Sequence, residues 1–325
     1  MRRVAVLASI VAVTACAPTA AGPAPATPIP AERVALDPRT TRVADGVVAW
    51  AEIGSGGDPV VLLNGTGSPM AEWDPALLGL LAGSRRVIVM DYPGLGASTP
   101  LSGRLTFDRL ADTVATWLSR IGVTRADVLG WSMGTFVAQR LAVTHPDLVD
   151  RLVLVGGNPG GRATKLGPRW VQRADSDPTA GLRTYLVTNY PRNRCAQAAG
   201  RAFLHRQAAA VDSGRYPPDR VPARTYDAMV AAEDPWLRSD RNLRQLGGIT
   251  APTLVLVGGD DVITPPANSR RLAAAIPGAG LTTVRGAGHS VLFQSPGAAA
   301  GIDSFLSDRL GPGERFDHYR LHADL

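Results

Sequence analysis

The chain has little of what metal- and nucleotide-dependent enzymes need. It contains 2 cysteines and 5 histidines in 325 residues, and the cysteines form no cluster. Lys165 is its single lysine, and no glycine-rich phosphate loop precedes it. Because zinc sites and phosphate-binding loops are built on such patterns, the sequence predicts no metal and no organic cofactor.

Long runs of one charge are also missing. The formal net charge is +6, from 34 basic and 28 acidic residues, and every basic residue except Lys165 is an arginine. These arginines form no basic tail and accompany no nucleic-acid recognition motif, so no nucleic-acid partner is expected. A hydrophobic content of 45% in a chain of this length fits one α/β core with an insertion.

The N-terminus carries an apolar segment that is too short to cross a membrane. Arg2 and Arg3 precede the apolar run Val4–Val13, after which small residues follow. This order is typical of a secretory signal peptide, here residues 1–15, and it predicts export from the cytoplasm.

The end of this segment, Val13-Thr14-Ala15-Cys16, resembles the bacterial lipobox. That resemblance implies a lipid on Cys16, which would anchor the protein to the membrane of the cell envelope. The alternative is a plain signal peptide, cut after an Ala-x-Ala-like site such as Ala15-Cys16-Ala17, and a secreted product. With a lipid on Cys16, no disulfide within the chain is possible, and Cys195 is then either a buried thiol, which we expect, or a lone reactive one.

Segments of low complexity flank the part that should fold. Residues 16–33 are mostly alanine, proline and threonine, and they have too few large apolar side chains to fold alone. They are interpreted as a semi-rigid tether. Residues 311–325 are expected to form a C-terminal tail.

Several apolar runs predict strands, and a helix is predicted over residues 106–121 with Thr106 as its N-cap. Gly46–Ile53 alternates roughly as a strand does, whereas Arg151–Gly157 and Thr253–Gly259 are nearly continuous apolar runs, which indicates strands covered on both faces. A mostly parallel sheet flanked by helices, and hence an α/β fold, follows from this pattern. The predicted strands are Gly46–Ile53, Pro59–Leu63, Arg86–Asp91, Val128–Leu129, Arg151–Gly157, Thr253–Gly259 and Leu281–Val284.

Residues 159–245 lie between two of these strands and are too long for a single crossover. Their several helical stretches predict an inserted helical cap, which divides the core into residues 34–158 and 246–310. The cap has 15 basic and 8 acidic residues. This excess fits a solvated arginine-rich surface, or a cap that attracts anionic substrates or anionic lipid.

Near the middle of the chain, Gly130-Trp131-Ser132-Met133-Gly134 joins an apolar segment to a helical pattern. A serine at a sharp turn between a strand and a helix needs small residues two positions before and after it. Gly130 and Gly134 fill these positions. Ser132 is therefore the candidate nucleophile, and a serine nucleophile needs a histidine base and an orienting carboxylate.

His289 is the candidate base, because it ends a glycine-rich loop after a predicted strand. Asp260 and Asp261 compete for the role of the acid. The other histidines are expected to be surface or packing residues: His145, His205, His318 and His322.

In these residues the chain resembles the α/β-hydrolase family, whose nucleophile, acid and histidine occur in the order of Ser132, Asp261 and His289. Gly258, Asp261 and Pro265 match the family's Gly-x-x-Asp-x-x-x-Pro spacing, which favours Asp261 over Asp260. The strand that ends at Gly156-Gly157-Asn158 has no carboxylate at the other place where the family keeps its acid.

Two more stretches carry the resemblance. Residues 91–98 match the family's Asp-x-x-Gly-x-Gly-x-Ser, and Asn64-Gly65-Thr66-Gly67 stands where the family usually has His-Gly-x-x. By resemblance, the backbone N–H groups of Thr66 and Met133 would form the oxyanion hole. Asn64 in place of histidine is a departure from the family.

The resemblance implies a serine hydrolase of the bacterial lipoprotein type that cleaves small-molecule carboxylic esters or related acyl substrates through an acyl-enzyme on Ser132. The arginines of the cap could suit an anionic substrate. A serine in the elbow argues against haloalkane dehalogenases and epoxide hydrolases, which use a carboxylate. Alternatives are a prolyl-type aminopeptidase and an enol-lactone or C–C bond hydrolase. From another class comes a surface binding module without catalysis, although such modules usually lose the serine or the histidine.

Overall fold

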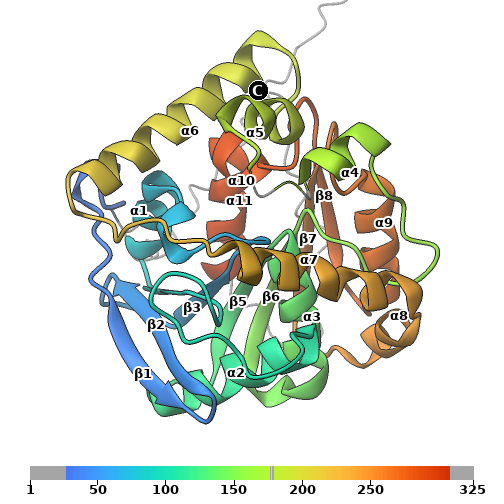
Figure 1. The fold of residues 1–325 in the computed structure, drawn as a ribbon, viewed down its shortest axis with the longest axis horizontal. Coiled ribbons are helices and arrows are strands. Elements are labelled where there is room, and N and C mark those ends of the chain that lie inside the picture. The colour runs from blue at the N-terminus through green and yellow to red at the C-terminus, as the bar shows by residue number, and fades with distance from the viewer. Residues whose placement is uncertain (1–26, 176, 178, 308–325) are drawn as a thin grey trace, which may run out of the picture.

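The computed structural model describes residues 27–175, 177 and 179–307, and it contains one sheet flanked by helices (Figure 1). Eight strands form this sheet in the order β1-β2-β4-β3-β5-β6-β7-β8. The strands are β1 (Arg39–Val43), β2 (Gly46–Ile53), β3 (Pro59–Leu63), β4 (Arg86–Met90), β5 (Ala126–Trp131), β6 (Val149–Val155), β7 (Thr253–Gly258) and β8 (Gly280–Val284).

The sheet is mostly parallel. Strand β2 runs antiparallel to both β1 and β4, whereas every pairing from β4 to β8 is parallel. In β5 and β7 every residue is buried, because helices cover both faces of the sheet. The predicted α/β fold is therefore confirmed.

The helices form two layers. α2, α3 and α9 contribute to the hydrophobic core on one face, and α1, α10 and α11 contribute to the core on the other. The helices are α1 (Pro75–Ala82), α2 (Phe107–Arg120), α3 (Met133–Thr144), α4 (Arg169–Asp175), α5 (Leu182–Asn189), α6 (Arg194–Asp212), α7 (Ala223–Arg238), α8 (Arg241–Gln245), α9 (Pro266–Ala275), α10 (Val291–Gln294) and α11 (Pro296–Ser307).

The local sequence explains most of these elements. Thr106 caps α2 by accepting a hydrogen bond from the backbone N–H of Arg109 at 3.2 Å, as its place in the sequence predicts. Asp74 caps α1 by accepting from Ala76. The sequence missed strand β1, because this edge strand has exposed polar residues and no apolar alternation.

Along the chain, helices α4 to α8 follow β6 and precede β7, and they belong to the segment that the sequence assigns to the cap (Figure 1). α7 is fixed to the core by Trp236, whose ring stacks on Phe136 at 5.0 Å between centroids. The indole N–H of Trp236 also donates to Asn158 Oδ1 at 2.9 Å. α7 is therefore held against the core by both apolar and polar contacts.

Ordered structure begins before the predicted end of the tether. Ile29 N donates to Gly79 O at 2.9 Å, and Arg215 on the cap side donates to the carbonyl oxygen of Ala31 at 3.0 Å. Residues 27–33 are thus hydrogen-bonded to α1 and to the segment after α6. The predicted signal peptide, Cys16 and the predicted tail at 311–325 lie outside the described residues. In the described part of the chain, no helix has the length and apolar character needed to cross a bilayer.

The prediction that Cys195 is buried was wrong. Cys195 is a free, exposed thiol in the first turn of α6. This helix buries Ala196, Gly200 and Phe203, which lie on one face at helical spacing, and Cys195 does not share that face.

Candidate active site

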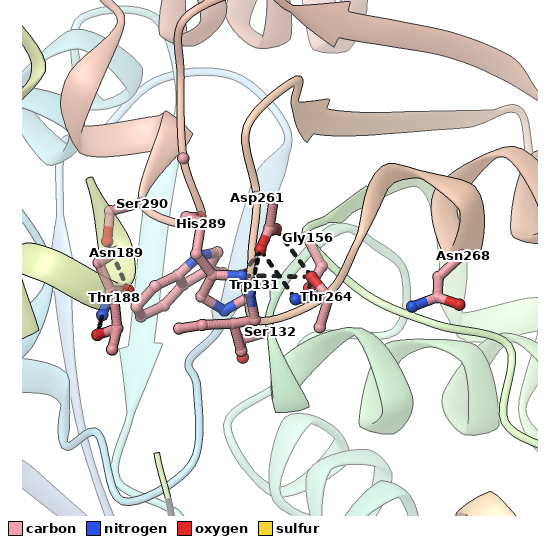
Figure 2. Close-up of polar contacts among 12 residues, drawn as sticks. Trp131, Ser132, Gly156, Thr188, Asn189, Asp261, Thr264, Asn268, His289 and Ser290 are labelled. Carbon is pink, nitrogen blue, oxygen red and sulfur yellow. Dashed lines mark hydrogen bonds and ion pairs between the residues drawn. The ribbon is translucent and has the colours of Figure 1, made fainter. Parts of the chain in front are cut away.

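The predicted site residues gather at the carboxyl ends of neighbouring parallel strands. Thr66 follows β3, Ser132 follows β5, Asp261 follows β7 and His289 follows β8. In open α/β sheets this edge is where ligands bind. Figure 2 shows Asp261 and His289 close to Ser132, although these three residues are far apart in the sequence.

Ser132 sits on a strained turn. Its φ of 54° and ψ of −123° make it the only residue other than glycine with positive φ in the described part of the chain. A Cβ on Gly130 would lie 2.5 Å from Gly134 O, and a Cβ on Gly134 would overlap Leu63 O. Both glycines are therefore required for the turn to close, and the resulting strain is typical of functional sites.

Asp261 and His289 form a buried pair. His289 Nδ1 lies 2.9 Å from Asp261 Oδ2, and both side chains are almost fully buried. The other carboxylate oxygen, Asp261 Oδ1, accepts hydrogen bonds from the backbone N–H groups of Ile263 at 2.9 Å and Thr264 at 2.8 Å. These bonds fix the orientation of the carboxylate, which in turn orients the imidazole.

Thr264 also contacts this pair, and sequence reasoning missed it. Its hydroxyl lies 2.7 Å from Gly156 O, 2.8 Å from Asp261 Oδ2 and 3.3 Å from His289 Nδ1. The signal that could have revealed it is its place in the Gly258–Pro265 stretch, three residues after Asp261, where turn residues fold back onto an aspartate side chain.

Trp131 holds the backbone of the histidine loop. Its indole N–H donates to His289 O at 3.0 Å, and the two rings lie 5.5 Å apart between centroids. Because Trp131 directly precedes Ser132, this bond ties the histidine loop to the elbow.

The loop after β3 keeps its shape without a histidine. Asn64 Oδ1 accepts from Gly65 N at 2.9 Å, and Asn64 Nδ2 donates to Pro69 O at 3.1 Å. The buried Asn64 side chain thus satisfies the polar groups of its own loop. No hydrogen bond among the described residues uses the N–H groups of Thr66 or Met133, so both remain available to an oxyanion.

Helix α7 contacts this loop from the cap side. Thr66 Oγ1 donates to Glu233 Oε1 at 3.1 Å, and Gly67 N lies 3.4 Å from Met229 Sδ. A Cβ on Gly67 would meet the Tyr226 ring. Since α7 is itself anchored on the core, it supports the loop that carries Thr66. The sequence held no signal for these contacts, which join residues more than 150 positions apart.

Two cavities meet at Ser132. The larger, of about 390 Å³, is lined by His289 and by residues of α5 and α6. The smaller, of about 250 Å³, is lined by residues of α3, α4 and α7. Both cavities share Thr66, Ser132 and Ile263, whereas His289 lines only the larger one. A substrate bound at Ser132 therefore has room for two arms of unequal size.

The other aspartate and histidine candidates from the sequence do not contact the Asp261–His289 pair in the hydrogen bonds of the described residues. Asp260 is exposed, and its backbone N–H bonds to Ala287 O at 2.9 Å. His145 lies 2.9 Å from Asp112 at the end of α3. No group of three or more His, Cys, Asp or Glu side chains in the described residues could hold a metal ion.

The arginines of the cap do not line the larger cavity. Arg206 forms an ion pair with Asp74, Arg215 donates to Val34 O at 2.9 Å, and Arg192 lies over the Trp170 ring at 5.6 Å. The only aspartate, glutamate, lysine or arginine side chains of the described residues that line the larger cavity are the carboxylates of Glu72, Asp177 and Asp219. The walls of the larger cavity thus give no support to the expectation that basic cap residues attract an anionic substrate, whereas Lys165 of the cap lines the smaller cavity.

Comparison with known proteins agrees with this architecture. A family model for the α/β-hydrolase fold matches residues 58–296. A Mycobacterium tuberculosis protein named as a non-heme bromoperoxidase, BpoC, is 30% identical over 256 residues, which cover 74% of this chain and 90% of the relative.

Two further relatives are esterases. A pimeloyl-(acyl-carrier protein) methyl ester esterase of Neisseria meningitidis is 30% identical over 253 residues, covering 75% of this chain and 91% of its own. The solved structure of the esterase RhEst1 from Rhodococcus sp. ECU1013 superimposes with a TM-score of 0.67 at 25% identity, covering 84% of this chain and 99% of that one.

Proposed function

The chain belongs to the α/β-hydrolase family, and from that premise we propose that it is a serine hydrolase that cleaves carboxylic esters. The observation that supports this most is the buried Asp261–His289 pair beside Ser132 on its strained elbow. The similarity of the chain to two proteins named as esterases agrees with this proposal.

In the proposed reaction, His289 takes the proton of Ser132, and the serine oxygen attacks the ester carbonyl carbon. The carbonyl oxygen becomes an oxyanion, which the N–H groups of Thr66 and Met133 stabilise. His289 then gives its proton to the leaving alcohol oxygen, and an acyl-enzyme remains. Water, activated by His289, hydrolyses this ester and restores Ser132, while Asp261 holds the imidazole tautomer throughout.

A fluorophosphonate probe tests the proposed nucleophile. The probe should label the protein once, and peptide mapping should place the label on Ser132. A panel of short and medium acyl esters, aminoacyl arylamides and enol-lactones should then show the fastest turnover on esters. Faster cleavage of the arylamides would favour the aminopeptidase alternative, and an unlabelled, inactive protein would favour a binding module.

We expect the contact between α7 and the oxyanion loop to influence catalysis. Glu233→Ala should lower kcat for ester hydrolysis about tenfold with little change in KM, because Thr66 loses a charge-assisted hydrogen bond that orients its N–H. Glu233→Gln keeps an acceptor oxygen and should recover most of kcat. Asp227→Ala, at an exposed position of the same helix, serves as the control. A rise in KM alone for Glu233→Ala would assign Glu233 to substrate binding instead.

We also propose that the protein is exported and anchored by a lipid on Cys16. The support is the sequence pattern Val13-Thr14-Ala15-Cys16 after the apolar run. In a bacterial host, wild type should incorporate an alkyne fatty acid and partition into detergent phase, whereas Cys16→Ser should do neither. Equal partitioning of both proteins would favour the secreted alternative.

A further inference from the structure

The position of His289 assigns the two cavities to the two arms of an ester. In acylation the histidine must hand its proton to the oxygen of the leaving alcohol, so the alcohol must lie on the histidine side of the nucleophile. His289 lines the larger cavity and does not line the smaller one. The acyl group then extends from Ser132 in the other direction.

Resting on the proposed acyl-enzyme reaction, we propose that the larger cavity receives the leaving alcohol and the smaller cavity receives the acyl group. The substrates are then esters in which a compact acyl group is joined to a bulky alcohol that is uncharged or cationic.

The walls of the larger cavity decide the charge of the alcohol. Glu72, Asp177 and Asp219 line it, and no lysine or arginine does so among the described residues. Burial, with a smaller contribution from the neighbouring Asp219, raises the pKa of Glu72 to about 8. Burial also raises the pKa of Asp219. A carboxylate on the alcohol would lose hydration beside these acidic groups with no basic side chain among the described residues to pair with, whereas an ammonium group could pair with them.

The smaller cavity suits a compact acyl group. Its apolar wall comes from α3, α4, α7 and the loops beside them. Lys165 also lines it, and both of its carboxylates are already engaged. Glu233 accepts from Thr66, and Asp234 forms an ion pair with Arg238 at 2.7 Å. The apolar residues of this wall are Phe136, Leu166, Val171, Val230, Leu237 and Ile263.

A matched pair of substitutions tests the assignment of the arms. Val230 on α7 lines only the smaller cavity, and Leu204 on α6 lines only the larger, and both are partly buried. Val230→Phe should lower kcat/KM for hexanoates relative to acetates about tenfold, by the same factor for every alcohol. Leu204→Phe should lower kcat/KM for 3,3-dimethylbutyl esters relative to methyl esters, by the same factor for every acyl group.

The deacylation step sharpens this test, because the alcohol has left before it begins. In single-turnover experiments, Leu204→Phe should leave the deacylation rate unchanged, whereas Val230→Phe should change it. Val230→Ala should raise kcat/KM for hexanoates relative to acetates, and Leu204→Ala should raise kcat/KM for 3,3-dimethylbutyl esters relative to methyl esters. These alanine variants provide the test if a phenylalanine variant does not fold. The reverse pattern, or no selectivity in any variant, would overturn the assignment.

Isosteric alcohols test the charge preference. The 2-(trimethylammonio)ethyl ester should react at least as fast as the neutral 3,3-dimethylbutyl ester, and an ester of a carboxylate-bearing alcohol should react about tenfold more slowly. The double variant Glu72→Gln, Asp219→Asn should reduce this difference, measured as the ratio of kcat/KM between the cationic and the carboxylate-bearing ester. Preference for the carboxylate-bearing alcohol would overturn the proposal. Neutral esters that react without these selectivities leave the esterase proposal intact, whereas an unreactive Ser132 would overturn both.

Discussion

Replacing Ser132 by alanine should abolish ester hydrolysis, with kcat reduced by at least about 10⁴-fold. Alanine keeps the Cβ and the backbone strain of the elbow but removes the attacking oxygen, so no acyl-enzyme can form. Initial rates with a neutral ester, together with loss of fluorophosphonate labelling, measure this effect.

Two further substitutions separate chemistry from stability. Ser119→Ala, on the exposed side of α2, should leave both activity and unfolding unchanged. Ser132→Gly should be as inactive as Ser132→Ala, yet more stable to unfolding by about 1–3 kcal/mol, because glycine adopts the backbone angles of the elbow without strain. Activity retained by Ser132→Ala would show that another group is the nucleophile.

Local patterns in the sequence were sufficient for most of the fold. The apolar runs at β3, β6 and β7 predicted buried parallel strands, because a strand covered on both faces has no polar face to show. Strand β1 could not be found in this way. It lies at the edge of the sheet and is held by pairing with β2, and its own residues are mostly polar.

The candidate site also has a part that local sequence patterns predict and a part that depends on tertiary packing. Ser132 could be predicted because the backbone of the elbow requires Gly130 and Gly134 around it. Asp261 and His289 could be predicted because their order and spacing resemble those of the family. The walls of the two cavities could not, since they depend on how α4 to α7 pack over the core. The excess of arginine in the cap was a poor guide to the cavity, because a side chain's direction is not encoded in local composition.

Asp261→Asn should lower kcat by about 10³–10⁴-fold, although the new side chain has nearly the same shape. The backbone N–H groups of Ile263 and Thr264 require an acceptor at the Oδ1 position, so the amide oxygen must take that place. The amide NH₂ then faces His289 Nδ1. This contact forces the imidazole proton onto Nε2, and His289 can no longer accept the proton of Ser132. Pre-steady-state acylation rates measure the loss.

The matched control is Asp260→Asn, one position away. Asp260 is exposed, and the partner of the imidazole at 2.9 Å is Asp261 Oδ2, so this variant should keep activity within about twofold. Both variants should unfold like wild type, because in Asp261→Asn the Thr264 hydroxyl can accept from the amide while it donates to Gly156 O. Loss of activity in Asp260→Asn, with activity kept in Asp261→Asn, would reverse the assignment of the orienting acid.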